Sequence, residues 1–238
     1  MSSVFAIIPA RSGSKGVKDK NIKKLHGHSL LEWSINAAKK SKLIDRVFIS
    51  TDSSQYAEIA KGYGAESPFL RPAAISGDTA SDLDFIMHAI DEWQKLDLKP
   101  DYLVHIRPTT PIRDPSIIDQ AISIFTNSDF NSLRSVHKMS ESSYKTLEIN
   151  DGSLTPLALF GDKKTDSNAP RQTFPDTYQA NGYVDVLDIK FIIKNKDIHG
   201  KRILPFITSI AHEIDSAEDF EYLEYKALNS EEIIKKLF

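Results

Sequence analysis

Short apolar runs alternate with stretches of helical periodicity over the first 135 residues, and this alternation constrains the fold more than any other feature. The runs SVFAIIPA (3–10), RVFIS (46–50) and DYLVHIR (101–107) are rich in β-branched and aromatic residues, which is typical of buried strands. Amphipathic stretches of helical spacing separate them. Strands that alternate with helices predict an α/β fold with a doubly wound, mostly parallel (mixed) sheet and helices on both faces.

Two helix starts are marked clearly in the sequence. Ser81 and Asp84 have the spacing of an N-cap and its third helical residue, ahead of an apolar stripe that ends near Trp93. Asp114 precedes Pro115, which suits the first position of a helix. We therefore predict helices that begin directly after residues 81 and 114.

The pattern changes near residue 137, where a polar and irregular segment begins. Residues 141–157 (ESSYKTLEINDGSLTPL) predict a hairpin, and residues 161–182 predict a long loop. A loop of that length inside a compact domain is unusual and is often functional. We expect one domain over residues 1–238, in which residues 137–180 form an inserted arm.

Composition excludes several classes of protein. The chain has no cysteine, so it can form neither a disulfide framework nor a thiolate metal site. Its net charge of -3 argues against a general nucleic-acid binder, which is more often basic. No stretch approaches the roughly 20 apolar residues of a membrane span, and the N-terminus lacks the basic and apolar regions of a signal peptide. These features predict a cytoplasmic protein with neither a nucleic-acid nor a membrane partner.

The loop after the first strand is strongly basic. Residues 1–24 contain six Lys or Arg and one Asp, a local charge of +5. Arg11 offers a fork for bidentate contacts with phosphate, and Lys15 and Lys20 are mobile point charges. A solvated surface turn is the alternative, but the position after a buried strand favours an anion site. The loop has neither the P-loop pattern nor the G-x-G-x-x-G pattern.

The segment IIPARSGSKGVKDKNIKKLHGHSLLEWSI (7–35) resembles the signature of the CMP-sialic acid synthetases, or acylneuraminate cytidylyltransferases, including the CMP-legionaminic and CMP-pseudaminic acid synthetases. Further matches follow in order: ISTDS (49–53), LRPAAISGDTAS (70–81), IRPTTPIR (106–113), PRQ (170–172), NG (181–182) and EIDSAEDF (213–220). The resemblance implies a fold like that of the nucleotide-diphospho-sugar transferases. It also implies that CMP passes from CTP to the anomeric hydroxyl of a nine-carbon sugar acid, with release of pyrophosphate.

The resemblance also implies roles on the nucleotide side. Arg11, Lys15 and Lys20 would hold the triphosphate and stabilise the departing pyrophosphate. Asn21, Arg71 and Ser81 match positions near the nucleotide, although simple helix capping is the alternative for Ser81.

On the sugar side, Lys145, Arg171 and Gln172 match family positions that contact the sugar acid. In the family the segment that carries them packs on a second subunit and closes the partner's site. The resemblance therefore implies a homodimer.

Phosphoryl transfer of this kind implies Mg²⁺, or Mn²⁺, held by oxygen ligands. We expect Glu213 and Asp215 to point to the same face at the end of a short strand, with Asp215 as the preferred metal ligand and Glu213 binding the metal directly, through water or not at all. The family usually has two aspartates here, so Glu213 is a departure. The alternative is that Asp215 or Ser216 caps the next helix.

Arg107 is a second departure, because the family commonly has glutamine at this position. We expect Arg107 to face the substrate and to bind the sugar carboxylate or an N-acyl group, while pairing with a nearby carboxylate is the alternative. For Arg113 we expect only a position at the border of the helix over residues 115–126.

Two other functions remain open on the sequence alone. A CMP-Kdo-type synthetase would act on an eight-carbon sugar acid, but its first loop usually runs through Ser-Thr-Arg to Pro-Gly-Lys. A non-catalytic nucleotide-binding homologue would keep the fold without the chemistry.

Overall fold

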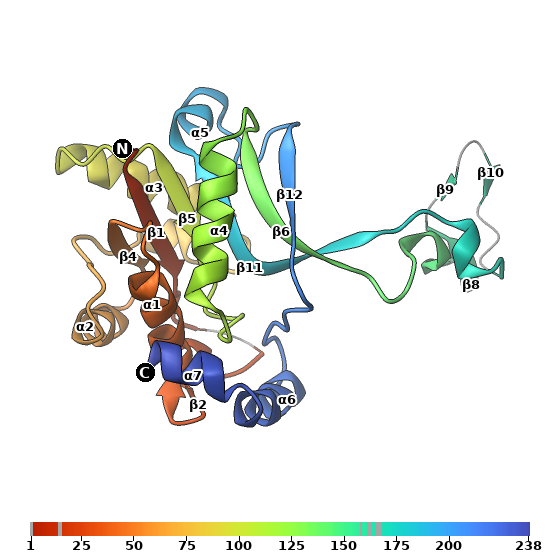
Figure 1. Cartoon of the computed structure of the whole chain (residues 1–238), viewed down its shortest axis with the longest axis horizontal. Coiled ribbons are helices and arrows are strands. Elements are labelled where there is room, and N and C mark those ends of the chain that lie inside the picture. The colour runs from red at the N-terminus through yellow and green to blue at the C-terminus, as the bar shows by residue number, and fades with distance from the viewer. Residues whose placement is uncertain (1, 14–15, 158, 161–162, 165–167) are drawn as a thin grey trace.

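The computed structural model describes residues 2–238 except 14–15, 158, 161–162 and 165–167. Its centre is a six-stranded sheet in the order β12-β6-β11-β5-β1-β4 (Figure 1). Neighbouring strands are parallel except at β11, which runs antiparallel to β5 and β6. The prediction of a mostly parallel, mixed sheet is confirmed. The strands are β1 (Val4–Pro9), β4 (Arg46–Ser50), β5 (Tyr102–His105), β6 (Ser132–Lys138), β11 (Tyr178–Asp188) and β12 (Ile203–Ile207).

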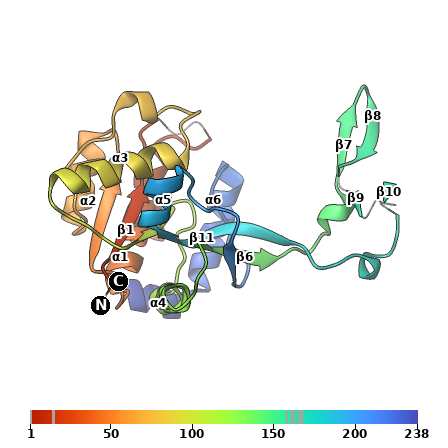
Figure 2. The same ribbon diagram turned by 90° about the horizontal axis from the view of Figure 1, so that it is seen from above.

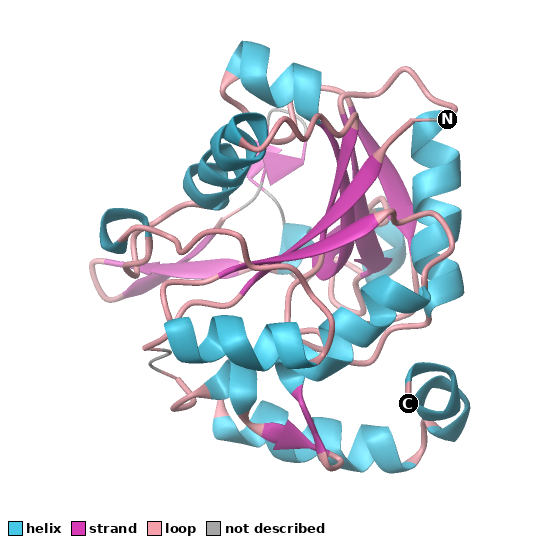
Figure 3. Cartoon of the chain, turned by 90° about the vertical axis from the view of Figure 1, so that its left-hand side faces the viewer, coloured by secondary structure: helices cyan, strands magenta, loops and turns pink. Residues whose placement is uncertain are grey.

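Helices cover both faces of the sheet (Figure 3). Alternate residues of β1 enter two separate apolar clusters: Ala6 and Ile8 pack with α1, α4 and α6, whereas Phe5 and Ile7 pack with α3 and α5. This alternation follows from the two-residue period of a strand that is buried on both sides. The helices are α1 (Leu30–Lys40), α2 (Ser54–Gly62), α3 (Asp82–Lys95), α4 (Pro115–Thr126), α5 (Ile189–Asn195), α6 (Ala217–Leu228) and α7 (Glu231–Leu237).

The two marked helix starts are confirmed. Ser81 caps α3 in a reciprocal capping box with Asp84. Asp114 caps α4, and Pro115 is its first residue. Among the described residues, no helix is long and apolar enough to cross a membrane.

An arm extends from the body where β6 and β11 run beyond the rest of the sheet (Figure 2). The predicted hairpin is confirmed as β7 (Leu147–Asn150) and β8 (Ser153–Pro156). The prediction of a loop up to residue 182 is wrong at its end: β11 already begins at Tyr178, because this residue pairs with Lys138 of β6. The arm also contains the short elements β9 (Leu159–Phe160), β10 (Lys163–Lys164), η3 (Ser143–Lys145) and η4 (Arg171–Thr173).

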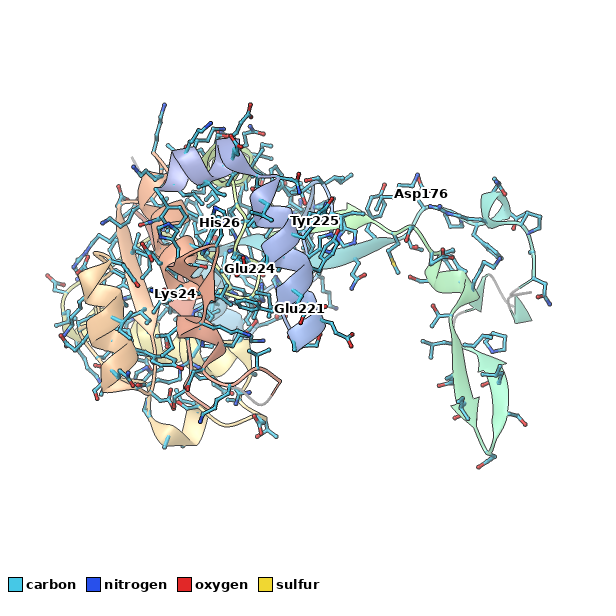
Figure 4. All side chains as sticks on the ribbon, turned by 90° about the horizontal axis from the view of Figure 1, so that it is seen from below. Lys24, His26, Asp176, Glu221, Glu224 and Tyr225 are labelled. Carbon is cyan, nitrogen blue, oxygen red and sulfur yellow. The ribbon has the colours of Figure 1, made fainter. Side chains whose placement is uncertain are left out.

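The first helix of the C-terminal pair, α6, packs on the segment that follows the basic loop. Glu224 of α6 accepts hydrogen bonds from the backbone N–H of His26, at 3.1 Å and 3.2 Å (Figure 4). Lys23 lies 4.0 Å above the ring of Phe220. These contacts hold the start of α6, and residues 211–215 before it, beside the basic loop. The remaining short elements are η1 (Lys20–Ile22), β2 (Lys24–Leu25), β3 (His28–Ser29) and η2 (Ala73–Ile75).

Candidate active site

A cavity of about 390 Å³ opens at the carboxyl ends of β1 and β5. Ligands of open α/β sheets bind at this edge, where the loops after the strands gather. The cavity brings together six of the residues singled out in the sequence: Arg11, Lys20, Asn21, Arg71, Arg107 and Asp215. Lys15 lies outside the described residues.

The basic loop is fixed by backbone contacts. Asp52 accepts hydrogen bonds from the backbone N–H and the hydroxyl of Ser12, at 2.7 Å and 2.8 Å. Asn21 donates to the carbonyl of Arg11 at 3.0 Å. A Cβ at Gly16 would collide with the carbonyl oxygen of Asp215, so only glycine allows the loop to approach the 211–215 segment this closely.

Two cations on this loop have carboxylates within reach. Arg11 forms an ion pair with Asp78 at 2.7 Å. Lys20 donates to the carbonyl of Ile214 at 2.5 Å and lies 3.4 Å from the carboxylate of Asp215. Both side chains line the cavity, so an anionic ligand would meet positive charge from the first loop of the sheet.

Arg71 is built into the wall of the cavity. It donates to the hydroxyl and the carbonyl of Ser50, at 3.0 Å and 2.7 Å, and its guanidinium lies 4.7 Å above the ring of Phe85. Burial lowers the pKa of Arg71 to about 10, so it remains charged at neutral pH.

Ser81 does not line this wall. Its side chain is exposed and bonds to Asp84 in the capping box of α3, while its neighbours Ala80 and Asp82 line the cavity. The capping alternative is therefore confirmed, and contact of Ser81 with a nucleotide stays a prediction.

Arg107 faces the cavity and is also paired. It donates to Asp185 at 2.8 Å and to Asp82 at 2.7 Å. Burial works against its charge, but the two carboxylates outweigh that effect and raise the pKa of Arg107. The alternative of pairing with a carboxylate is confirmed, and the guanidinium also lines the cavity, while contact of Arg107 with the sugar acid stays a prediction.

The expectation for Arg113 is wrong. The side chain is fully buried and donates to the carbonyls of Tyr183, Arg107 and Gly182, at 2.6 to 2.8 Å. Burial lowers the pKa of Arg113 to about 9. Arg113 directly precedes the cap of α4 but does more than border this helix, because it fastens the loop after β5 to β11.

The expected short strand that ends at Asp215 is also wrong, because residues 211–215 pair with no strand. It is held by Ile214, which is buried and whose N–H donates to the carbonyl of Thr109 at 2.9 Å. The carboxylate of Glu213 lies against Gly182 and Thr110, whereas Asp215 lines the cavity. The two carboxylates do not share one face of a strand.

Asp215 suits a divalent cation better than Glu213 does. Ser216 caps α6, so the Asp215 carboxylate is not used as the cap, and 80% of this side chain is exposed. No group of three or more His, Cys, Asp or Glu side chains with metal-binding geometry occurs among the described residues. A single carboxylate is compatible with Mg²⁺, which is often held by one or two carboxylates together with phosphate oxygens and water.

The predicted sugar-side residues of the arm lie apart from this cavity. Arg171 and Gln172 line a second hollow of about 350 Å³, between β6 and the start of β11. Arg171 donates to the carbonyl of Met139 at 2.9 Å, and Lys145 is the last residue of η3 in the same arm.

Sequence analysis missed two acidic residues that shape the site. Asp52 lies in the ISTDS motif, which gave no hint of its bonds to the basic loop. Asp185 is almost fully buried in β11, and the signal that could have revealed it is a lone charge within the apolar run YVDVL.

A mixed sheet with a cationic cavity at the carboxyl ends of its strands defines a protein of the nucleotidyltransferase-like α/β class. The chain belongs to the cytidylyltransferase family, whose model matches residues 5–230. This confirms the family seen in the sequence motifs.

Individual relatives agree with this assignment. Post-translational flagellin modification protein B of Campylobacter coli is 32% identical over 231 residues, which cover 94% of this chain and 95% of that protein. The CMP-N,N'-diacetyllegionaminic acid synthase of Legionella pneumophila is 31% identical over 214 residues, 89% of this chain and 90% of that protein. The solved structure of a CMP:2-keto-3-deoxy-manno-octonic acid synthetase in complex with CTP superposes with a TM-score of 0.69 over 96% of this chain and 99% of that one, at 12% identity.

Proposed function

We propose that this protein transfers CMP from CTP to the anomeric hydroxyl of a nine-carbon 2-keto-3-deoxy sugar acid and releases pyrophosphate. The observation that carries the proposal is the convergence of Arg11, Lys20 and Asp215 on one cavity in a member of the cytidylyltransferase family. The relatives named for CMP-N,N'-diacetyllegionaminic acid synthesis support an acceptor of the sialic, legionaminic or pseudaminic type. We also propose that the reaction takes place in the cytoplasm, where CTP is made.

In the proposed reaction the anomeric oxygen attacks the α-phosphorus of CTP. A new O–P bond forms, the hydroxyl proton is released to solvent, and the bond from the α-phosphorus to the bridging oxygen breaks to release pyrophosphate. The contribution of the protein is positioning and neutralisation of charge. Lys20 and Arg11 would contact the phosphates, with Arg11 exchanging its ion pair with Asp78 for phosphate oxygens. Asn21 holds the carbonyl of Arg11, which fixes the loop from which these cations extend.

We propose Mg²⁺, or Mn²⁺, as the cofactor and Asp215 as the residue that would hold it. When bound, the ion adds positive charge at the phosphate oxygens. The exposed carboxylate of Asp215 on the cavity wall supports this role. Glu213, which lies against Gly182 and Thr110, is better suited to supporting the wall than to ligation.

We further propose a homodimer in which the arm of one chain completes the site of the other. The arm that carries Lys145, Arg171 and Gln172 extends away from the body of its own chain, which supports this arrangement (Figure 2). The arm also exposes apolar side chains that would be covered in an interface: Leu147, Ile149, Leu154, Leu157 and Tyr178.

The direct test is an assay of pyrophosphate release with CTP, Mg²⁺ and a panel of sugar acids. We expect turnover with N,N'-diacetyllegionaminic acid or another nine-carbon acid of this type, and none when CTP is omitted. Preference for the eight-carbon acid 3-deoxy-manno-octulosonic acid would instead indicate a CMP-Kdo-type enzyme. Binding of CTP without pyrophosphate release from any acid would indicate a non-catalytic homologue.

Gly16→Ala is expected to weaken CTP binding by at least about tenfold, because the new methyl group would displace the basic loop from the carbonyl of Asp215. Isothermal titration with CTP measures this effect. Gly62→Ala is the matched control, since a Cβ at Gly62 meets nothing within 4 Å. Equal CTP affinity in both variants would show that the close approach at Gly16 does not matter for binding.

A further inference from the structure

Two carboxylates lie against the basic loop after β1, the loop that we propose to hold the phosphates of CTP. Asp52, in the turn between β4 and α2, accepts the two hydrogen bonds from Ser12. Asp19, near the other end of the loop, accepts a hydrogen bond from the hydroxyl of Tyr56 at 3.1 Å. On Coulombic grounds alone, a negative charge beside a phosphate site weakens binding. The two carboxylates therefore call for a different explanation.

Asp52 and Tyr56 come from one short stretch of chain at the start of α2. Ser53 between them caps this helix and accepts a hydrogen bond from the backbone N–H of Tyr56 at 3.3 Å. The cap holds both residues in place at the end of the helix. From there they reach the loop at two separate points, at Ser12 and at Asp19.

Tyr56 is well suited to fix Asp19. Its side chain is almost fully buried, and burial together with the hydrogen bond to Asp19 raises the pKa of its hydroxyl to about 12, so it is a donor at neutral pH. Asp19 has a left-handed backbone with a φ of 50°, which is uncommon for a residue other than glycine. Its carbonyl accepts a hydrogen bond from the N–H of Ile22 at 3.0 Å, so Asp19 also begins η1.

Each of the two contacts lies next to a cation of the cavity. Ser12 directly follows Arg11, and Asp19 directly precedes Lys20. Arg11 and Lys20 line the cavity. The bonds from Asp52 and Tyr56 therefore fix the backbone from which both cations extend.

The same stretch of chain holds Arg71. Its guanidinium donates to Ser50, and its backbone N–H donates to the carbonyl of Thr51 at 2.7 Å. Residues 50–56 thus contact both the basic loop and Arg71, yet none of these residues, all of which are described, lines the cavity. They can set the distance between the two parts of the site without touching a ligand.

We propose that Tyr56 and Asp52 are positioning residues that hold the basic loop in place for the triphosphate of CTP. They act through the two loop residues to which they bond, and neither side chain contacts the nucleotide. This inference rests on the proposed function and concerns the nucleotide half of that site. Without the two bonds the loop would keep its cations, but these would have to be ordered when CTP binds, and the cost of this ordering would lower the affinity.

The test compares the affinities of CTP and CMP, measured by isothermal titration in the presence of Mg²⁺. Tyr56→Phe removes one hydroxyl and no charge, and it leaves the exposed carboxylate of Asp19 in water. We expect this variant to bind CTP about 5- to 20-fold more weakly than the wild type does. CMP should bind almost equally well to both, because it lacks the two phosphates that the loop would hold. A general loss of structure would weaken both ligands alike.

Tyr63→Phe is the matched control for Tyr56→Phe. Tyr63 is the C-cap of α2, so the same hydroxyl is removed at the end of the helix that is remote from the basic loop. We expect wild-type affinity for CTP in this variant.

Asp52→Ala and Asp52→Asn test the second contact through the sign of the effect. If the Asp52 carboxylate acted only through its charge, its removal would strengthen CTP binding. We expect the opposite for Asp52→Ala, a loss of about tenfold in CTP affinity with little change for CMP. Asp52→Asn should recover part of this loss, because its amide oxygen can still accept the N–H of Ser12.

Three results would overturn the inference and leave the proposed function standing. These are equal CTP affinities for Tyr56→Phe and Tyr63→Phe, equal losses of CTP and CMP affinity in the variants, or tighter binding of CTP to Asp52→Ala. Failure of the wild type to bind CTP would contradict the proposed function itself, and the inference with it.

Discussion

Arg11→Ala is expected to lower kcat/KM for pyrophosphate release by about 10²- to 10³-fold without unfolding the protein. The guanidinium lines the cavity on a loop whose backbone is held independently, through Ser12 and Asp52. Its removal would therefore take away a fixed positive charge at the leaving phosphates and leave the loop in place. Initial rates at varied CTP, together with a thermal unfolding curve, measure the two parts of this prediction.

Arg46→Ala is the matched control for Arg11→Ala. Both arginine side chains are 34% exposed and each forms an ion pair, Arg11 with Asp78 and Arg46 with Glu66. Arg46 lies at the opposite end of its strand from the cavity, so its loss removes the same charge without touching the site. A similar decrease in turnover for both variants would exclude a specific role of Arg11 in the reaction.

Local signals account for the parts of the fold that the sequence predicted well. The helix that begins after Asp114 needs only a capping carboxylate and Pro115, which act within a few residues of each other. The capping box of Ser81 and Asp84 is local in the same way. Buried strands such as Arg46–Ser50 are marked by their own composition and by the helices on either side.

The sequence-based predictions were wrong where the position of a side chain depends on contacts between segments that are distant in the chain. The position of Arg113 depends on the carbonyls of Gly182 and Tyr183, about 70 residues away in the chain. The direction of the Glu213 side chain depends on Ile214. The backbone hydrogen bond from Ile214 to Thr109 takes the place of the strand pairing that we expected before Asp215. Neither contact leaves a pattern in the residues next to it. The same holds for Asp185, whose partner Arg107 comes from another strand end.

Candidate site residues fall between these two cases. Sequence motifs singled out Arg11, Lys20 and Asp215 from two separate segments, and the fold brings all three to one cavity. Which of them contact a phosphate is a matter of ligand geometry, so their roles stay predictions. Neither Lys145 nor Arg171 lines the cavity of its own chain, so their predicted contact with the sugar would require the proposed second chain.

Asp215→Ala is expected to reduce Mg²⁺-dependent turnover by about 10²- to 10³-fold and to raise the Mg²⁺ concentration needed for half-maximal rate. The reason is that Asp215 is the exposed carboxylate on the cavity wall beside Lys20, where a cation would meet both the protein and the phosphates of CTP. The new alanine leaves the cap of α6 intact, because Ser216 and Asp219 form it. Titration of the initial rate with Mg²⁺ at saturating CTP is the measurement.

Glu213→Ala is the control for Asp215→Ala. It also removes one negative charge from residues 211–215, so it tests whether any lost carboxylate in this segment would change the Mg²⁺ titration. Glu213 lies two residues away but faces Gly182 and Thr110, so its removal should change the metal titration far less than the removal of Asp215. Its main expected effect is on stability, because the buried Arg113 would lose a nearby carboxylate. Identical Mg²⁺ titrations for wild type and Asp215→Ala would move the metal to another residue. A larger shift in Glu213→Ala than in Asp215→Ala would mean that Glu213 turns toward the cavity when the substrates bind.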